Sequence, residues 1–192
     1  MAATDRPTIF FTGEAEFRTW LESNHANSEG VWAKFAKKDA GIVSLNHAGA
    51  LRQALCFGWI DGQARRLDDT YYLQGFTPRR ARSTWSKRNV ALVAELTEQG
   101  LMHPAGQAQI DQAKADGRWE LAYAGPAEAE LPQDFLAELA KNPKATEFFA
   151  TLDKQNQFAI YLRLHNAVKP DVRARRIAKL VDLLAAGEKP QR

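Results

Sequence analysis

Residues 55–89 read LCFGWIDGQARRLDDTYYLQGFTPRRARSTWSKRN, and the organisation of the whole chain is inferred outward from this stretch. The acidic turn 68–70 separates 64–67 from 71–76, and this pattern predicts a β-hairpin. The stretch also holds two tryptophans, four other aromatic residues, and seven Arg or Lys against three Asp. No other part of the chain combines aromatic and basic side chains so densely, so the functional site is expected here.

Hydrophobic spacing and helix-terminal residues predict the other elements of the N-terminal region. Strands are expected at 31–35 and 56–60, and helices at 13–23 (capped by Thr12), at 46–55, from after Ser83 to about 99, and from Pro104 to Gly117. Residues 1–119 are therefore predicted to form an α+β domain, a small antiparallel sheet packed with helices on one face.

The chain beyond residue 119 is predicted to be helical. Residues 120–131 are rich in Ala and Glu and are interpreted as a linker, followed by an all-helical C-terminal region over 132–192. Two apolar stripes with helical spacing are expected to face its core. They consist of Phe158, Tyr161, Leu162 and His165, and of Ile177, Leu180, Val181 and Leu184.

Composition excludes several classes of protein. The 192 residues are 45% hydrophobic and 26% charged, enough for a core and a polar surface, and no apolar run reaches the roughly 18 residues needed to cross a bilayer. The N-terminus lacks the pattern of a signal peptide, and the single cysteine forbids an internal disulfide. We therefore expect a cytoplasmic protein in a reducing compartment, without membrane insertion.

Common cofactor and catalytic signatures are also missing from the sequence. It has no GxxxxGK[ST] loop, no GxGxxG after a strand, no HExxH and no GxSxG. No Cys/His set has zinc-ligand spacing, so neither a metal nor a cofactor is predicted.

Positive charge is local in this chain. Residues 56–90 carry seven basic and three acidic side chains, although the net charge of the whole chain is only +3. The basic residues gather around the expected start of the helix after Ser83, where cations oppose the helix dipole by about 0.3–1 kcal/mol each. Such a local conflict is expected where function requires it.

Backbone N–H groups, hydroxyls and Arg side chains together would form a receptor for phosphate or carboxylate. The alternative is a solvated basic turn whose arginines pair with Asp68, Asp69 or other acids. The predicted ligand-binding residues are Trp59, Asp61, Arg79, Arg80, Arg82, Ser83, Trp85, Ser86, Lys87 and Asn89, with Arg88 in the same cluster.

Aromatic side chains beside the cluster could stack on a ligand. One of Trp59, Trp85, Tyr71 and Tyr72 is expected to face it, and the alternative is that they are core residues. Asp61 is the best single carboxylate and a weak candidate for a general base. It is more simply read as a turn residue paired with Arg65 or Arg66.

Two further sets of residues are candidates for a functional role. Cys56 could be a nucleophile with His47 as its base, but the apolar setting LCFGW favours an inert buried thiol. Arg173, Arg176 and Lys179 lie close together on one helix surface by their spacing and form a secondary basic patch. That patch is either a second anion site or a solvated face.

Several blocks in this order resemble the YdeI/OmpD-associated proteins, also called bacteriocin-protection proteins. The blocks are residues 54–62 (ALCFGWIDG), 76–80 (FTPRR), 83–89 (STWSKRN), 100–102 with 105–106, 116–119 (DGRW) and 173–177 (RARRI). The resemblance spans nearly the whole chain. It implies a bacterial protein linked to tolerance of bacteriocins or cationic antimicrobial peptides, with no established reaction.

Three functions are therefore carried forward. The first is a non-enzymatic cytoplasmic protein of stress tolerance that binds a small or polymeric anion. The second is an enzyme acting on a phosphorylated small molecule with Asp61 as general base, and the third is an RNA-binding module. A protein partner is also possible, and nucleic acid is not favoured because the net charge is low.

Overall fold

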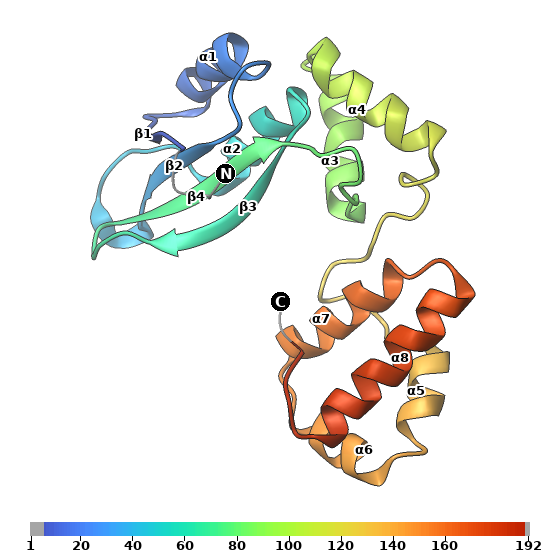
Figure 1. The fold of residues 1–192 in the computed structure, drawn as a ribbon. Coiled ribbons are helices and arrows are strands. Elements are labelled where there is room, and N and C mark those ends of the chain that lie inside the picture. The colour runs from blue at the N-terminus through green and yellow to red at the C-terminus, as the bar shows by residue number, and fades with distance from the viewer. Residues whose placement is uncertain (1–5, 191–192) are drawn as a thin grey trace. The chain divides into compact units, whose positions relative to one another are not determined.

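The computed structural model describes residues 6–190 and divides the chain into two compact units, with the boundary between Ala122 and Tyr123 (Figure 1). The first unit contains a sheet and helices, and the second contains helices. The fold is therefore α+β with a helical C-terminal region, as predicted. The predicted boundaries of a domain at 119 and a linker over 120–131 remain predictions.

The four-stranded sheet of the first unit has the order β1-β2-β4-β3. Its strands are β1 (Thr8–Phe10), β2 (Val31–Ala36), β3 (Trp59–Arg66) and β4 (Tyr71–Pro78). Strands β3 and β4 form the predicted hairpin, with Trp59 opposite Pro78 and Asp61 opposite Phe76. The sheet is mixed rather than wholly antiparallel, because the unpredicted β1 lies parallel to β2. A helix connects these two strands, and such a crossover allows a parallel pairing.

Four helices and a 3-10 turn (Lys38–Ala40) accompany this sheet. The helices are α1 (Glu14–Asn24), α2 (His47–Cys56), α3 (Lys87–Glu98) and α4 (Pro104–Ala115). Helix α2 contacts α1, β3, α3 and α4, and most of its residues are buried. A helix that is apolar on most sides must be enclosed in this way. It therefore forms the centre of the first core (Figure 1).

Three predicted boundaries in the first unit were wrong by a few residues. Thr12 is not the N-cap of α1, since Gly13 takes that position and Thr12 instead donates two hydrogen bonds to the Glu16 carboxylate. Cys56 belongs to α2 rather than to a strand, because Gly58, with φ of 73°, ends the helix and lets β3 begin at Trp59.

Helix α3 begins at Lys87, not directly after Ser83. The N-cap is Ser86, whose hydroxyl oxygen accepts the backbone N–H of Asn89 at 3.1 Å. Residues 79–86 therefore form an irregular segment between β4 and α3.

The second unit contains α5 (Gln133–Leu139), α6 (Pro143–Ala150), α7 (Lys154–His165) and α8 (Pro170–Ala185). Helix α8 contacts each of the other three, and its predicted stripe is buried throughout. The stripe predicted for α7 is only partly correct. Tyr161 is buried with Ile160 and Leu164, whereas Phe158 and Leu162 remain half-exposed.

Candidate anion-binding site

Arg79 follows the last residue of β4 and points into the protein. Its backbone N–H donates to the Gly58 carbonyl oxygen at 3.0 Å, and its Nη2 donates to the carbonyl oxygen of Thr84 at 2.6 Å. The guanidinium lies 3.7 Å from the centre of the Trp85 ring, and the residue is only 6% exposed. Arg79 therefore holds the segment 79–86 in shape and does not reach solvent as a free cation.

The next residues form a tight turn. The Ser83 N–H donates to the Arg80 carbonyl oxygen at 2.8 Å, and the Arg80 N–H donates to the Ser83 hydroxyl at 2.9 Å. Both Ser83 and Ser86 thus accept backbone hydrogen bonds, which leaves their hydroxyl protons able to donate to a ligand. The turn presents the side chains of Arg80 and Arg82 to solvent.

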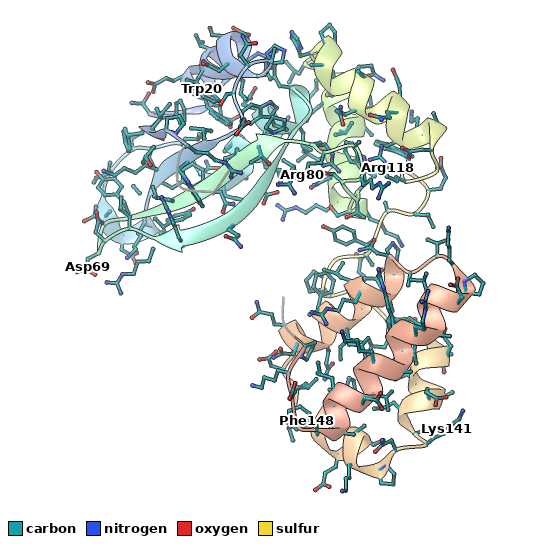
Figure 2. All side chains as sticks on the ribbon, viewed as in Figure 1. Trp20, Asp69, Arg80, Arg118, Lys141 and Phe148 are labelled. Atoms are coloured by element: carbon teal, nitrogen blue, oxygen red, sulfur yellow. The ribbon has the colours of Figure 1, made fainter. Side chains whose placement is uncertain are left out.

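Two residues far along the chain complete the support of this segment. Arg118 donates from Nη1 to the Ser83 carbonyl oxygen at 2.8 Å and also forms an ion pair with Asp116. Hydrogen bonds from Arg118 hold the pKa of the Asp116 carboxyl below its usual range. Trp119 packs edge-on against Trp85 with ring centres 5.0 Å apart. Figure 2 labels Arg80 on the segment before α3 and Arg118 on the segment after α4.

Four cations lie exposed around the start of α3, namely Arg80, Arg82, Lys87 and Arg88, and we call these four residues the basic surface. Within residues 6–190, none of the four forms an ion pair with a carboxylate. The first turn of α3 also contains no acidic residue. Its first N–H groups, at Lys87 and Arg88, lie outside the intrahelical hydrogen bonds. Positive charge and donors therefore converge here without a neutralising partner.

The acids expected in the alternative interpretation are used elsewhere. Asp69 forms an ion pair with Arg66. Asp68 accepts the backbone N–H groups of Thr70 and Tyr71, which lower the pKa of its carboxyl. The expectation that these two aspartates neutralise the basic cluster is therefore wrong.

The predicted aromatic residues occupy different environments. Trp59 and Trp85 are each 1% exposed, and the Trp59 indole N–H donates to the His25 carbonyl oxygen at 3.2 Å. Tyr71 is half-buried beneath Lys34, whose ammonium lies 3.8 Å from its ring centre, and Tyr72 packs edge-on against Phe35. Asn89 is 8% exposed in the first turn of α3. Trp85 is therefore a buried residue that supports the segment carrying the basic surface.

Asp61 pairs with His47, which the sequence did not suggest. Its Oδ2 lies 2.9 Å from His47 Nε2, and both side chains are partly exposed. The expected pairing with Arg65 or Arg66 is wrong, because Arg66 binds Asp69 and Arg65 stacks 4.1 Å from the centre of the Trp32 ring. The two candidates for acid–base chemistry are therefore joined in one contact.

Cys56 is fully buried in the first core, and burial raises the pKa of its thiol. His47 is not its base, since that imidazole contacts Asp61. A buried, protonated thiol is inert, so the setting predicted for Cys56 is confirmed.

The three residues of the predicted secondary basic patch have different environments in the second unit. Arg173 is occupied by two hydrogen bonds to the Asp134 carboxylate and one to the Leu164 carbonyl oxygen at 2.8 Å. Arg176 and Lys179 instead line a cavity of about 370 Å³ together with Arg163. The patch therefore loses one predicted member and gains Arg163, which lies on α7 and is brought near only by packing.

Sequence reasoning missed Arg118 and Trp119 as supports of the basic segment. Both lie in the block 116–119, which was noted only as part of a resemblance. Because they are more than 30 residues from Ser83, no local pattern could connect them with it. Among residues 6–190, no group of three or more potential metal ligands occurs. No helix in the described part of the chain is long and apolar enough to cross a membrane.

The fold and the site define a protein built from an α+β unit, which carries an exposed basic surface, and a helical unit. The chain belongs to the family described as a domain of unknown function (DUF8412), whose model matches residues 9–109, more than half of the chain. A second model, described as bacteriocin-protection, YdeI or OmpD-associated, matches residues 128–187. The resemblance to the YdeI/OmpD-associated proteins is thereby confirmed over residues 128–187, and it links the chain to bacteriocin protection at the family level.

The two matches divide the blocks that carried the resemblance. Residues 54–62, 76–80, 83–89 and 100–106 lie within the first match, and only 173–177 lies within the second. No curated protein and no solved structure matches the chain.

Proposed function

We propose that this is a non-enzymatic protein that binds phosphate- or carboxylate-bearing anions at the basic surface of Arg80, Arg82, Lys87 and Arg88. The observation that carries the proposal is that four exposed cations surround a helix start with no carboxylate paired to any of them in residues 6–190. Elsewhere in the same unit, exposed cations such as Arg66 do have such partners. An uncompensated cluster of this kind attracts anions.

The number of exposed cations at the site indicates a ligand with several charges. Each exposed ion pair contributes about 1 kcal/mol or less, so four together give about 4 kcal/mol, which corresponds to a dissociation constant near 1 mM. A single small anion would therefore bind weakly. A polymer such as polyphosphate or single-stranded RNA offers neighbouring phosphates to all four cations and further registers along its length.

The segment is suited to such contacts because its backbone is held firmly while its side chains are free to adapt. Arg79, Trp85 and Arg118 stabilise residues 79–86 from within. The hydroxyls of Ser83 and Ser86 add donors at the same surface. A backbone that is already ordered lowers the entropy lost when an extended anion binds.

The experiment measures binding of fluorescein-labelled polyphosphate and of a labelled RNA oligomer by anisotropy at two salt concentrations. The double variant Arg80→Glu/Arg82→Glu is compared with Lys38→Glu/Lys144→Glu, which makes the same change in net charge at exposed lysines elsewhere. If four phosphates are contacted, affinity is expected to fall about 50-fold between about 50 and 200 mM salt.

Loss of binding in the first double variant alone supports the proposal. Equal binding by both double variants, or affinity that does not respond to salt, overturns it. Inorganic phosphate and a nucleotide serve as small competitors, and displacement by either at micromolar concentration would show that the ligand is small rather than polymeric.

We further propose that this binding operates in the cytoplasm, in tolerance of bacteriocins or antimicrobial peptides. The family match at residues 128–187 supports the tolerance role. A single, buried and free cysteine suits a reducing compartment. Replacing the native gene with the Arg80→Glu/Arg82→Glu variant is expected to lower bacteriocin survival as much as deletion does, and unchanged survival contradicts this role.

An enzyme remains the second candidate, and the contact between His47 and Asp61 favours it. An aspartate at 2.9 Å can orient an imidazole and select its tautomer, so His47 rather than Asp61 would be the general base. The substrate would be a phosphorylated small molecule held by the nearby arginines. Release of phosphate from a panel of phosphomonoesters should then disappear in His47→Gln, and turnover that survives this change rules the enzyme out.

A further inference from the structure

The outer face of α7 carries exposed apolar side chains that the core does not use. Ile160, Tyr161 and Leu164 turn inward, while Phe158 and Leu162 remain half-exposed on the other side. This arrangement reverses the expectation that Phe158 and Leu162 belong to the core. Large apolar side chains that line a hollow on a surface indicate a place where another apolar group binds.

A cavity of about 770 Å³ lies over this face. It is lined by Phe158, Ala159 and Leu162 of α7 and by Pro126. Lys154 and Arg163 also line it, nine residues apart on the helix, which is about 13 Å at 1.5 Å per residue. The volume lies within the range of small-molecule sites, about 300–1,000 Å³, and a mainly apolar wall with few polar groups is typical of them.

The second cavity, of about 370 Å³, adjoins the first through a shared residue. It is lined by Arg163 from α7 and by Arg176, Lys179, Leu180 and Leu183 from α8. Arg163 lines both cavities, so the apolar hollow and the basic one are neighbours. The carbonyl oxygen of Arg163 accepts a hydrogen bond from Arg176 Nη1 at 2.7 Å, which ties the two helices together at this junction.

Two of the cations that line the basic cavity, Arg176 and Lys179, have no acidic partner among residues 6–190. Neighbouring arginines on α8 are paired, Arg173 with Asp134 and Arg175 with Asp171. Within residues 6–190, Arg176 and Lys179 form no ion pair, and no carboxylate lines either cavity. The combined site therefore offers an apolar surface from Phe158, Ala159 and Leu162 next to the positive charge of Arg176 and Lys179.

We propose that this site binds a single-chain amphiphilic anion, with its acyl chain on Phe158, Ala159 and Leu162 and its carboxylate or phosphate head beside Arg163, Arg176 and Lys179. An inorganic anion alone would leave the larger, apolar cavity unfilled. A neutral apolar molecule would leave Arg176 and Lys179 without a counter-charge. Only a ligand that carries both parts matches both halves, and the length between Lys154 and Arg163 suits roughly ten chain carbons.

The probe is 11-(dansylamino)undecanoic acid, whose emission increases when it leaves water for an apolar site. All five tryptophans lie at or before residue 119, so the second unit contributes no tryptophan signal. Decanoate, 1-decanol and inorganic phosphate compete for the bound probe. We expect decanoate to displace the probe at least about fivefold better than 1-decanol does, because only the former has a head group for the cations. Longer carboxylates should bind about fourfold tighter per added methylene until the groove is filled.

Each half of the site has a variant and a matched control. Leu162→Asp places a charge in the apolar cavity and is compared with Val168→Asp, at a position in the same unit that is 66% exposed and lines neither cavity. Lys179→Glu reverses a head-group cation and is compared with Arg175→Glu, at a position on the same helix that is also outside both cavities. Far-UV circular dichroism verifies that each variant remains folded.

Weaker probe binding, by about fivefold or more, in Leu162→Asp and in Lys179→Glu but in neither control supports the proposal. An unchanged affinity in Leu162→Asp overturns it, as does displacement by inorganic phosphate alone. Binding to vesicles of anionic lipid without binding of the monomeric probe also overturns it and identifies a membrane-docking face. Because Arg80 and Arg82 are unchanged in these variants, failure here is separate from failure of the proposed function.

Discussion

The guanidinium of Arg79 lies 3.7 Å from the ring centre of Trp85, and its Nη2 donates to the carbonyl oxygen of Thr84, the residue before that tryptophan. One side chain thus fixes both the ring and the backbone of the segment that leads into α3. The ring itself is held from another direction by Trp119. The exposed cations of the basic surface depend on this buried contact for their position.

Trp85→Ala is expected to destabilise the first unit by about 3–5 kcal/mol, because it empties a fully buried site and removes the surface on which Arg79 stacks. Trp85→Phe keeps part of the ring and should cost less. Chemical denaturation followed by circular dichroism measures both. A loss below about 1 kcal/mol in Trp85→Ala would contradict a structural role for this tryptophan.

Gly106→Ala is expected to destabilise the packing of α4 on α2. A Cβ atom at Gly106 would lie 2.1 Å from the carbonyl oxygen of Cys56, which is backbone and cannot move aside alone. The expected cost is about 1–3 kcal/mol or more. Gly125→Ala is the control, since a Cβ atom there meets nothing within 4 Å, and its stability should not fall. Thermal unfolding compares the two, and equal stability would show that α4 packs differently.

Tyr161→Phe is expected to destabilise the second unit by about 1–3 kcal/mol. The Tyr161 hydroxyl accepts the backbone N–H of Ala124 at 3.0 Å, and Ala124 is buried. Removing the hydroxyl leaves that donor without its partner while the ring is retained. Amide hydrogen exchange at Ala124 should accelerate as well, and unchanged exchange would exclude this hydrogen bond.

The free energy of unfolding is expected to decrease as the pH is lowered, because of His103. Burial, followed by the neighbouring His25, lowers the pKa of its imidazole. Its Nδ1 accepts the Ala105 N–H at 3.2 Å as the N-cap of α4, which requires that nitrogen to be unprotonated. The folded state therefore binds fewer protons than the unfolded state, so stability decreases as pH falls from about 6.5 through the lowered pKa.

His103→Asn keeps a capping acceptor that does not titrate. The variant should therefore lose this part of the pH dependence, which lies between about pH 6.5 and the lowered pKa of His103. A helix cap contributes about 1 kcal/mol. Unfolding free energies measured across this range provide the comparison. Parallel pH profiles for the variant and the original protein would contradict the assignment.

Much of the first unit could be predicted from local sequence. The hairpin followed from two aromatic segments around an acidic turn, and the start of α4 followed from Pro104 at its first position. The basic character of residues 79–88 was also evident from composition alone. The roles of its members were not, because whether an arginine is exposed or buried depends on what packs against it.

Helix α7 shows why periodicity can mislead. It is apolar at 158 to 162 and again at Leu164, so two different faces satisfy helical spacing. Helix α8 has most of its large apolar residues on one face, at Ile177, Leu180, Val181 and Leu184, and its stripe was predicted correctly. Only the packing of the second unit decided that α7 turns Ile160 and Leu164 inward and exposes Phe158 and Leu162.

The sequence by itself determined the fold class, the hairpin and the place of the basic segment, because these depend on residues that are close together in the chain. The tertiary structure alone decided that Arg79 is buried on Trp85, that Asp61 meets His47 and that Arg163 joins Arg176 and Lys179. Spacing along the chain did not predict these contacts. Each depends on how strands and helices pack in three dimensions.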